Sequence, residues 1–154
     1  MAAVHYRKAD LADVPGLVGL PREGEAGGDT RMWRYLAGEH HPQQALLPRA
    51  MWIAAEDDSP IGYVAGHLTR RLDCDGELQW IYVVPTYRRT RVASKLLRIL
   101  AGWFVEHGAL RVCVDVGDDQ ARPFYRHHGA MELNRHWMVW TDISEVLGRS
   151  TART

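Results

Sequence analysis

The sequence predicts an α/β fold, and two observations lead to that prediction. Short segments of alternating apolar residues recur along the chain, and between two of them lies a segment whose apolar residues repeat every three or four positions. The succession of strand, helix and strand over residues 78–116 implies a parallel strand pair joined by a right-handed crossover. With 154 residues, the chain fits a single domain, expected over residues 1–147, followed by a disordered tail at 148–154.

The first expected elements are a strand over Val4–Lys8 and a helix after it. Asp10 and Asp13 both have side chains suited to an N-cap. Because proline is tolerated only in the first turn of a helix, Pro15 favours Asp13 as the cap.

A loop and a hairpin are expected next. Residues 20–31 hold three glycines and many charges, which predicts a loop, followed by a short helix over 32–37. Residues 51–55 and 61–68 are apolar, and the acidic, proline-containing segment 56–60 between them is typical of a hairpin turn. These two strands should therefore pair antiparallel.

The second half holds the clearest helix, over Val92–Val105. Its apolar residues keep to one face for four turns, and Gly108 can end it in a left-handed conformation. The remaining elements are a turn at 73–76, a strand over 78–84, a strand over 110–116, a helix after it, and a strand over 135–140 that closes the sheet.

Composition excludes several classes of function. Nineteen acidic and nineteen basic side chains cancel, so no overall field favours nucleic acid or an anionic membrane. The N-terminus lacks the regions of a signal peptide, and no apolar run approaches the ~20 residues that span a bilayer. Cys74 and Cys113 lie in unrelated contexts and are expected to be reduced thiols, with Cys113 in the core. A cytoplasmic protein is expected.

A basic turn between a strand and a helix is the strongest functional signal. The first N–H groups of a helix have no intrahelical partner, and the helix dipole adds positive charge there. Four cationic side chains reinforce that charge: Arg88, Arg89, Arg91 and Lys95. The turn therefore predicts a site for phosphates, although a solvated run of charges is the simpler explanation of the turn taken alone.

A second segment supports the functional explanation. About thirty residues later the chain reads Asp118-Asp119-Gln120-Ala121-Arg122-Pro123-Phe124-Tyr125-Arg126-His127-His128-Gly129-Ala130. Together the two segments resemble the cofactor-binding core of the GNAT superfamily of acetyl-CoA-dependent N-acetyltransferases, over residues 76–141.

Two positions depart from that family's pattern. In the first segment Arg88 and Ala93 match, but Arg91 stands where the family has glycine; in the second, Ala121 and Tyr125 match, but Asp118 replaces the usual asparagine. A non-glycine residue in the left-handed region loses about 1–2 kcal/mol. Either the turn keeps ordinary φ angles, or Arg91 offsets strain by contacting a phosphate, or the affinity for the cofactor is weakened.

The resemblance implies a GNAT fold: a mixed, mostly antiparallel sheet with helices on both faces and a splayed parallel strand pair that admits the pantetheine arm. It implies acetyl-CoA as co-substrate and no metal. A backbone N–H near Val83 or Val84 would polarise the thioester carbonyl. The implied cofactor-binding residues are Tyr82, Val83, Val84, Arg88, Arg89, Thr90, Arg91, Val92, Ala93, Ser94 and Asp118.

The implied activity is transfer of an acetyl group to a primary amine in a ternary complex. Tyr125 resembles the family's general acid, since a phenol of pKa ~10 can protonate a thiolate whose thiol lies at ~8.5; the alternative is that Tyr125 only packs in the core. Glu77 stands where some members carry a general base that acts directly or through water, and Gln79 shares its strand face. The alternative for Glu77 is a solvent-facing glutamate.

Three other functions are weighed against this one. A CoA-binding regulatory module without catalysis would explain the changes at Arg91 and Asp118. A nucleic-acid binder is disfavoured by the zero net charge. A metal site is disfavoured because the paired histidines are adjacent rather than four apart, and His67 is expected to be a satisfied core histidine.

The acceptor stays open between a small molecule and a protein amine. Acidic residues in segments that border the expected cleft would favour a cationic amine: Glu39, Asp73, Asp75 and Glu77. Trp137 and Trp140 fall on opposite faces of the last strand, so that one of them can line a cleft or the interface of a homodimer.

Overall fold

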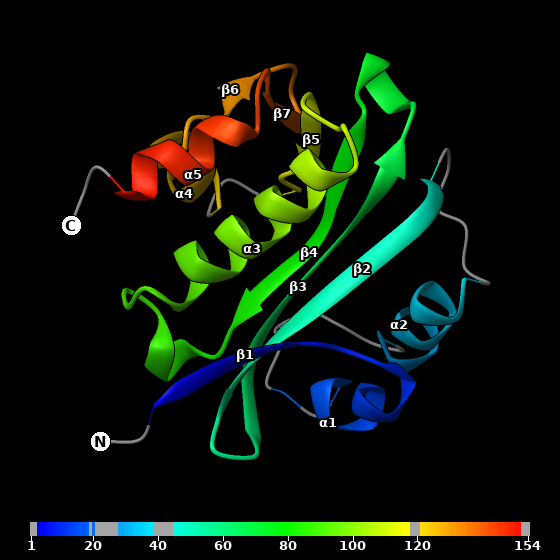
Figure 1. Ribbon diagram of the computed structural model, residues 1–154, viewed down its shortest axis with the longest axis vertical. Coiled ribbons are helices and arrows are strands. Elements are labelled where there is room, and N and C mark those ends of the chain that lie inside the picture. Colours follow the sequence, from blue (N-terminus) through cyan, green and yellow to red (C-terminus); the bar gives the residue numbers. More distant parts are fainter. Residues whose placement is uncertain (1–2, 19, 21–27, 39–44, 118–120, 152–154) are drawn as a thin grey trace.

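A seven-stranded sheet runs through the structure, with strand order β1-β2-β3-β4-β5-β7-β6 (Figure 1). The structure is a computed structural model that describes residues 3–18, 20, 28–38, 45–117 and 121–151. Neighbouring strands are antiparallel except β4 and β5, which are parallel. The strands are β1 (Val4–Lys8), β2 (Ala45–Glu56), β3 (Ser59–Thr69), β4 (Gly76–Val83), β5 (Val112–Asp115), β6 (Met131–Glu132) and β7 (Trp137–Trp140). The expected mixed α/β sheet is confirmed.

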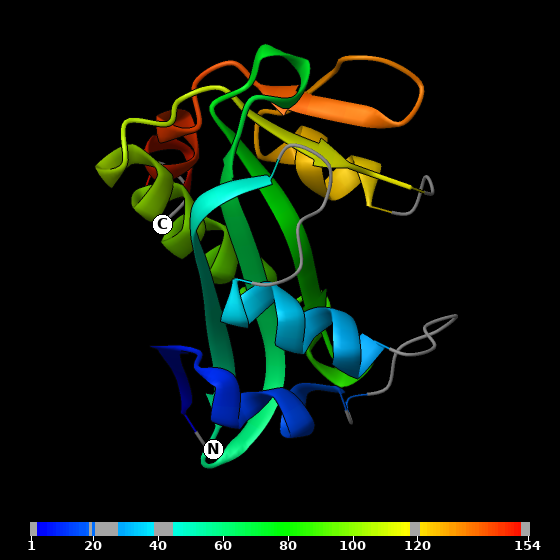
Figure 2. The same cartoon turned by 90° about the vertical axis from the view of Figure 1, so that its right-hand side faces the viewer.

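Helices cover both faces of this sheet (Figures 1 and 2). On one face α3 packs over β2, β3 and β4 with α5 beside it, and on the other lie α1 and α2. The helices are α1 (Val14–Val18), α2 (Gly28–Ala37), α3 (Val92–Glu106), α4 (Arg122–His127) and α5 (Ser144–Thr151), with 3-10 turns η1 (Leu11–Asp13), η2 (Arg71–Asp73) and η3 (Pro85–Tyr87). The described residues form three buried apolar clusters: a large one under α3, a smaller one under α1 and α2, and a third made of Cys74, Cys113 and Val139.

The central hairpin and the crossover helix have the expected form. β2 and β3 pair antiparallel with Glu56 opposite Ser59, and both strands extend further than their apolar cores. In α3 the side chains of Leu96, Leu97 and Leu100 are fully buried, and Gly108 after its end has a φ of +73°. Burial of this apolar face drives the helix onto the sheet.

The N-terminal helices begin elsewhere than predicted. Asp10 is the N-cap of η1, which leads into α1: it accepts from the N–H of Ala12 at 2.9 Å, while Asp13 accepts from the N–H of Asp10 at 2.8 Å. Asp13 as N-cap was wrong, because its carboxylate turns back to Asp10 and to Arg7. The second helix starts at Gly28 rather than at residue 32, so the expected loop ends earlier.

The C-terminal part also differs from the prediction. Strand β7 lies between β5 and the short outer strand β6, so the strand expected to close the sheet is not at its edge. The boundary expected at residue 147 falls inside α5, which runs to Thr151 because Ile143 and Val146 are buried against the core under α3. Residues 152–154 lie outside the described part of the chain.

The absence of a side chain at Gly62 in β3 allows the end of β4 to approach closely. A Cβ on Gly62 would lie 2.6 Å from the carbonyl oxygen of Tyr82, so we expect Gly62→Ala to destabilise the fold by about 1–3 kcal/mol. The matched control is Gly102→Ala in α3, where a Cβ meets no atom within 4 Å and alanine should stabilise by about 0.5–1 kcal/mol. Urea unfolding of both variants measures the difference, and equal midpoints would contradict the close approach of β3 and β4.

Candidate functional site

The parallel strands β4 and β5 separate partway along their length. They pair at only three positions, the last being Leu78 with Val114, although β4 continues to Val83. Beyond that point no strand among the described residues pairs with this edge of β4, so that backbone groups such as the N–H of Val83 can serve another partner. The splay expected from the resemblance is therefore present.

The backbone of β4 shows which group can face the splay. The N–H of Val84 donates to the carbonyl of Ile61 in β3 at 2.9 Å, so it is already used. Backbone groups alternate between the two edges of a strand, which turns those of Val83 away from β3. Of the two N–H groups expected to polarise a thioester, only that of Val83 is on the open side.

A β-bulge interrupts β4 where the splay begins. Ala65 pairs with Trp80 and the next residue of β3, Gly66, pairs with Leu78, so Gln79 is an extra residue. Its Oε1 is buried without a hydrogen-bond partner among the described residues. Such a bulge changes the alternation of side chains along the strand.

The basic turn connects the open end of β4 to α3. Arg88 to Arg91 are exposed, and Arg89 has a φ of +64° whereas Arg91 has a φ of −96°. The position where the family has glycine is therefore unstrained, and the left-handed residue is Arg89. Strain at Arg91 is excluded as an explanation for its departure from the family pattern.

The first turn of α3 presents backbone N–H groups beside these cations. Thr90 accepts from the N–H of Val92 at 3.3 Å through its Oγ1, while the side chain of Val92 is buried in the core. Ala93 is half-buried, and the hydroxyl of Ser94 bonds to Nε2 of His128 at 3.0 Å. The groups that could bind an anion here are the backbone N–H groups at the N-terminal end of α3. Arg89, Arg91 and Lys95 add positive charge to this part of the chain.

Arg88 is exposed, yet its side chain contacts the end of β4. Its Nε donates to the carbonyl of Val83 at 3.1 Å, and its guanidinium lies 5.7 Å from the ring centre of Tyr82. Arg88 therefore contacts both Val83 and Tyr82, two of the residues expected to bind the cofactor, and stabilises the end of β4.

Tyr125 is held in the core by α4. It is 4 % exposed, and its ring packs edge-on against Trp140 with ring centres 5.7 Å apart. The bond between Ser94 and His128 joins this short helix to the first turn of α3. Asp118, the other expected cofactor contact of this segment, lies outside the described residues.

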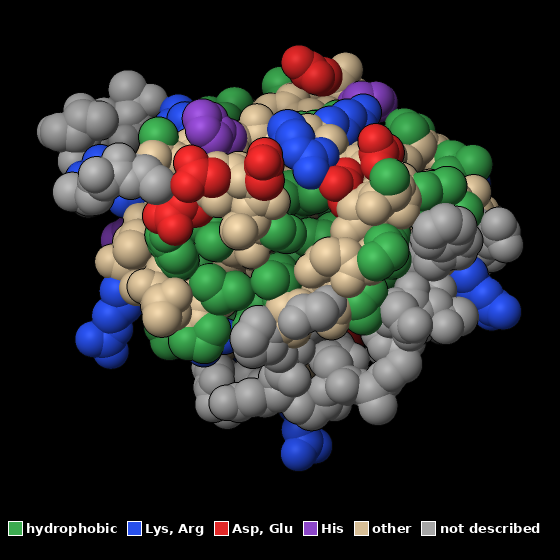
Figure 3. Space-filling model, turned by 90° about the horizontal axis from the view of Figure 1, so that it is seen from below, with side chains coloured by type: hydrophobic (Ala, Val, Ile, Leu, Met, Phe, Trp, Pro, Cys, Tyr) green, Lys and Arg blue, Asp and Glu red, His purple; other side chains and the backbone are tan. Residues whose placement is uncertain are grey.

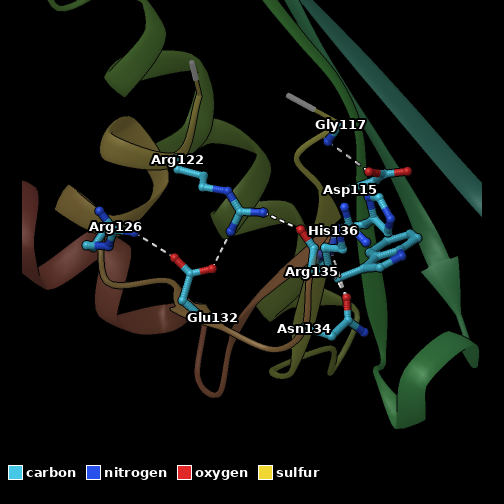
Figure 4. Close-up of polar contacts among 9 residues, drawn as sticks. Asp115, Gly117, Arg122, Arg126, Glu132, Asn134, Arg135 and His136 are labelled. Carbon is cyan, nitrogen blue, oxygen red and sulfur yellow. Dashed lines mark hydrogen bonds and ion pairs between the residues drawn. The ribbon is translucent and has the colours of Figure 1, made fainter. Parts of the chain in front are cut away.

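A network of arginines that the sequence did not single out fixes α4 to the β6–β7 hairpin (Figure 4). Arg122 binds both the carboxylate of Glu132 and the carbonyl of Arg135, and Arg126 binds Glu132 at 2.6 Å. Asn134 accepts from backbone N–H groups within the hairpin. Nothing local in the sequence pairs these residues, since Arg122 and Arg135 meet only through the fold.

Glu77 is buried and paired at the start of β4. It is 5 % exposed, its Oε1 accepts from Nε of Arg71 at 3.0 Å, and Nε2 of His67 lies 3.4 Å from the same oxygen. Arg71 in turn lies 5.0 Å from the ring centre of Trp137. The alternative of a solvent-facing glutamate is therefore wrong. His67 is a core histidine, as expected, but only its Nδ1 is satisfied, by the hydroxyl of Tyr35, while its Nε2 has no hydrogen-bond partner among the described residues.

The other acidic residues that were expected to border the cleft differ in their surroundings. Asp75 accepts from the N–H groups of Leu110 and Arg111 and is thus part of the fold. Asp73 is exposed with a φ of +59°, while Glu39 lies outside the described residues.

Another acidic group lies around α1 and the β2–β3 turn, at the end of the molecule where charged side chains lie along one side of an apolar area (Figure 3). There the hydrogen bond to Asp13 raises the pKa of Arg7, and the charges of Asp10 and Asp58 add to the effect. These carboxylates are therefore partly neutralised by Arg7.

No helix among the described residues is long and apolar enough to span a bilayer. No three or more histidine, cysteine or acidic side chains among them gather as metal ligands would.

Comparison with solved structures shows the same fold in several acetyltransferases. PaiA N-acetyltransferase from Thermoplasma acidophilum in complex with coenzyme A has a TM-score of 0.69 and 15 % identity over 91 % of this chain and 99 % of its own. The NatC complex bound to Gag peptide and CoA contains a chain with a TM-score of 0.63 and 17 % identity, over 89 % and 94 % of the two chains.

An aminoglycoside acetyltransferase from an uncultured soil metagenomic sample, in complex with sisomicin, has a TM-score of 0.61 and 15 % identity over 86 % of this chain and 93 % of its own. Comparison with curated proteins finds no match. A sequence model of the acetyltransferase (GNAT) family matches residues 21–130, which is more than half of the chain. With this match, and with the splayed strands and basic turn that it covers, the protein belongs to the GNAT acetyltransferase family.

Proposed function

We propose that this protein is an N-acetyltransferase that moves an acetyl group from acetyl-CoA to a primary amine by direct attack in a ternary complex. The observation that carries the proposal is the basic turn at the open end of β4, next to the splay between β4 and β5, in a chain of the acetyltransferase family. The function is assigned to one domain, and the unbridged thiols Cys74 and Cys113 support a reducing compartment such as the cytoplasm. A homodimer stays a prediction.

The residues present fit the chemistry of the co-substrate. Its phosphates are anions, and the first turn of α3 offers N–H groups with Arg89, Arg91 and Lys95 nearby. Its amide-containing arm can pair with the unpartnered edge of β4, much as an added strand would. When bound, acetyl-CoA supplies an activated acyl group and a thiolate leaving group.

Three groups of the protein are assigned roles in the reaction: a base, a hydrogen-bond donor to the acyl oxygen, and an acid. Glu77, directly or through a water, takes a proton from the ammonium, which frees the nitrogen lone pair for attack on the acyl carbon. The N–H of Val83 donates to the acyl oxygen as negative charge develops there. The hydroxyl of Tyr125 gives its proton to the departing sulfur, and the second proton that the attacking nitrogen loses restores the phenol. Because the amine attacks the acyl carbon directly, no covalent enzyme intermediate forms.

The acceptor is proposed only as a primary amine. Relatives in solved structures carry an aminoglycoside or a peptide, so small molecules and protein amines both belong in the test. The carboxylate of Glu77 at the start of β4 favours an acceptor that arrives as a cation. Assaying thiol release over a panel of both amine classes identifies the class.

A second function is favoured by one observation. Tyr125 is almost fully buried and Glu77 is paired with Arg71, which is what a CoA-binding regulatory module without catalysis would also show. Stabilisation by acetyl-CoA with no turnover over the amine panel would select this alternative.

We expect Ala93→Glu to abolish acetyl-CoA binding, because the new carboxylate would face the phosphates at the start of α3. At 100 times its Kd, acetyl-CoA should stabilise the parent by about 2.7 kcal/mol. The control Gly102→Glu adds the same charge to the same helix, at a site with space, and should keep the ligand-induced rise in Tm. If calorimetry shows that Ala93→Glu binds acetyl-CoA as tightly as the parent, the phosphates do not bind at this turn.

Replacing Tyr125 with Phe should separate binding from chemistry. The ring still packs against Trp140, so the Kd for acetyl-CoA should stay within a few fold of the parent value. Loss of a positioned acid should lower kcat by roughly 10²–10⁴. If Tyr125→Phe turns over at the parent rate with chemistry rate-limiting, Tyr125 has only a packing role.

Glu77→Gln should lower kcat/KM chiefly at low pH, where the amine is protonated and needs a base. As pH rises and free amine accumulates, the rate should recover toward that of the parent. A pH–rate series on one acceptor measures this, with the Tm of each variant as control because Glu77 also pairs with Arg71. An equal loss at every pH would point to a structural role.

A further inference from the structure

Four elements meet in a buried chain of polar side chains that ends at Glu77. The hydroxyl of Tyr35 in α2 lies 2.8 Å from Nδ1 of His67 in β3, and Nε2 of His67 lies 3.4 Å from Oε1 of Glu77 in β4. Nε of Arg71 in η2 donates to that same oxygen at 3.0 Å. Tyr35 and His67 are both 0 % exposed, so water does not reach this chain from their side.

The partners of His67 determine where its ring proton lies. An ionised carboxylate only accepts hydrogen bonds, so an Nε2 that faces Glu77 must carry hydrogen. In the neutral ring Nδ1 is then bare and accepts from the hydroxyl of Tyr35. At 3.4 Å the contact to Glu77 is longer than a full hydrogen bond, and Nε2 has no hydrogen-bond partner among the described residues, which leaves the carboxylate as the nearest acceptor for its hydrogen.

Tyr35 acts in this chain as a fixed donor. Burial raises the pKa of its hydroxyl well above that of a free phenol, so it stays protonated. Arg49, which lies opposite His67 in β2, fastens Tyr35 by donating to its carbonyl at 3.0 Å and by placing its guanidinium 5.1 Å from the ring centre. Trp80 packs on the same ring, with ring centres 4.9 Å apart.

The two oxygens of Glu77 are used unequally. Both Arg71 and His67 contact Oε1, so Oε2 is the oxygen that neither of these two contacts uses. The remaining titratable group opposite Glu77 is the thiol of Cys113 in β5, which is its register partner. The contact with Cys74 and, after it, burial raise the pKa of that thiol, so it carries no charge. The arrangement leaves Oε2 as the atom able to accept a proton.

We propose that His67, oriented by Tyr35, is a positioning residue whose Nε2–H holds Oε1 of Glu77 in place, so that Oε2 is available to take the proton of the amine. The inference rests on the proposed function, since Glu77 is the base there. In the step itself, an N–H bond of the ammonium breaks and an O–H bond forms at Oε2. His67 neither gains nor loses a proton.

The first test is the pH profile of kcat/KM on one acceptor for the parent, His67→Leu and His67→Gln. Leucine removes the donor, which disfavours the ionised carboxylate, so the acidic limb should move up by about 0.5–1 pH unit. Glutamine places an N–H near the position of Nε2 and should keep the parent limb. A folded His67→Leu that loses the same factor at every pH, or whose limb does not move, overturns the proposal.

Tyr35→Phe is the second variant, because it keeps the ring and removes only the hydroxyl. It should shift the limb in the same direction as His67→Leu but less far, and an unmoved limb in the folded variant contradicts the role of Tyr35. Melting temperatures of all variants separate folding from chemistry.

A measurement that needs no turnover keeps this inference separate from the proposed function. In ¹⁵N NMR of the parent, His67 should carry hydrogen at Nε2. A ring protonated only at Nδ1 overturns the inference even in an active enzyme. Conversely, a parent with the Nε2–H ring and no acetyl transfer to any amine contradicts the proposed function and leaves the geometry of this chain intact.

Discussion

The short pairing of β4 with β5 is the constraint on which the rest of the site depends. A parallel pair requires a crossover, and here α3 provides it, so that its N-terminus lies just after the end of β4. Because the strands pair at three positions only, the edge of β4 opens toward that same end. An edge of β4 without a strand neighbour among the described residues and a cationic helix end thus arise from one feature of the topology.

Burial of Glu77 is the second constraint. A carboxylate taken out of water requires partners, and removing one partner of a buried pair costs about 3–5 kcal/mol. Arg71 and His67 provide that compensation at Oε1, and each comes from a different element. The bulge at Gln79 lies two residues further along, where the strand must both keep its pairing with β3 and release β5. Packing, charge and the proposed chemistry therefore meet within a few residues of β4.

The turn before α3 shows how a departure from a family pattern can be accommodated. Arginine in place of glycine would be costly only at a left-handed φ, and Arg91 has an ordinary one. The left-handed residue is Arg89 instead, while Thr90 bonds the first N–H of the helix. The extra cation thus lies at the end of α3 without backbone strain at its own position.

Sequence alone determined much of the architecture. Periodicity located α3, the β2–β3 hairpin and the crossover, because each depends on local burial of one face. It did not locate α5 or β6, nor the cap of η1, because short elements and caps depend on neighbours distant in the chain. The family and the basic turn were readable because their residues are contiguous.

Only the tertiary structure decided the surroundings of the proposed base. Tyr35, His67 and Glu77 are separated by tens of residues or by a turn, and no local pattern relates them. Whether Glu77 faces solvent or the core depended on the packing of α2 and η2 against the sheet. Burial then forced its pairing, since a charge withdrawn from water must be compensated by groups that only the fold brings near.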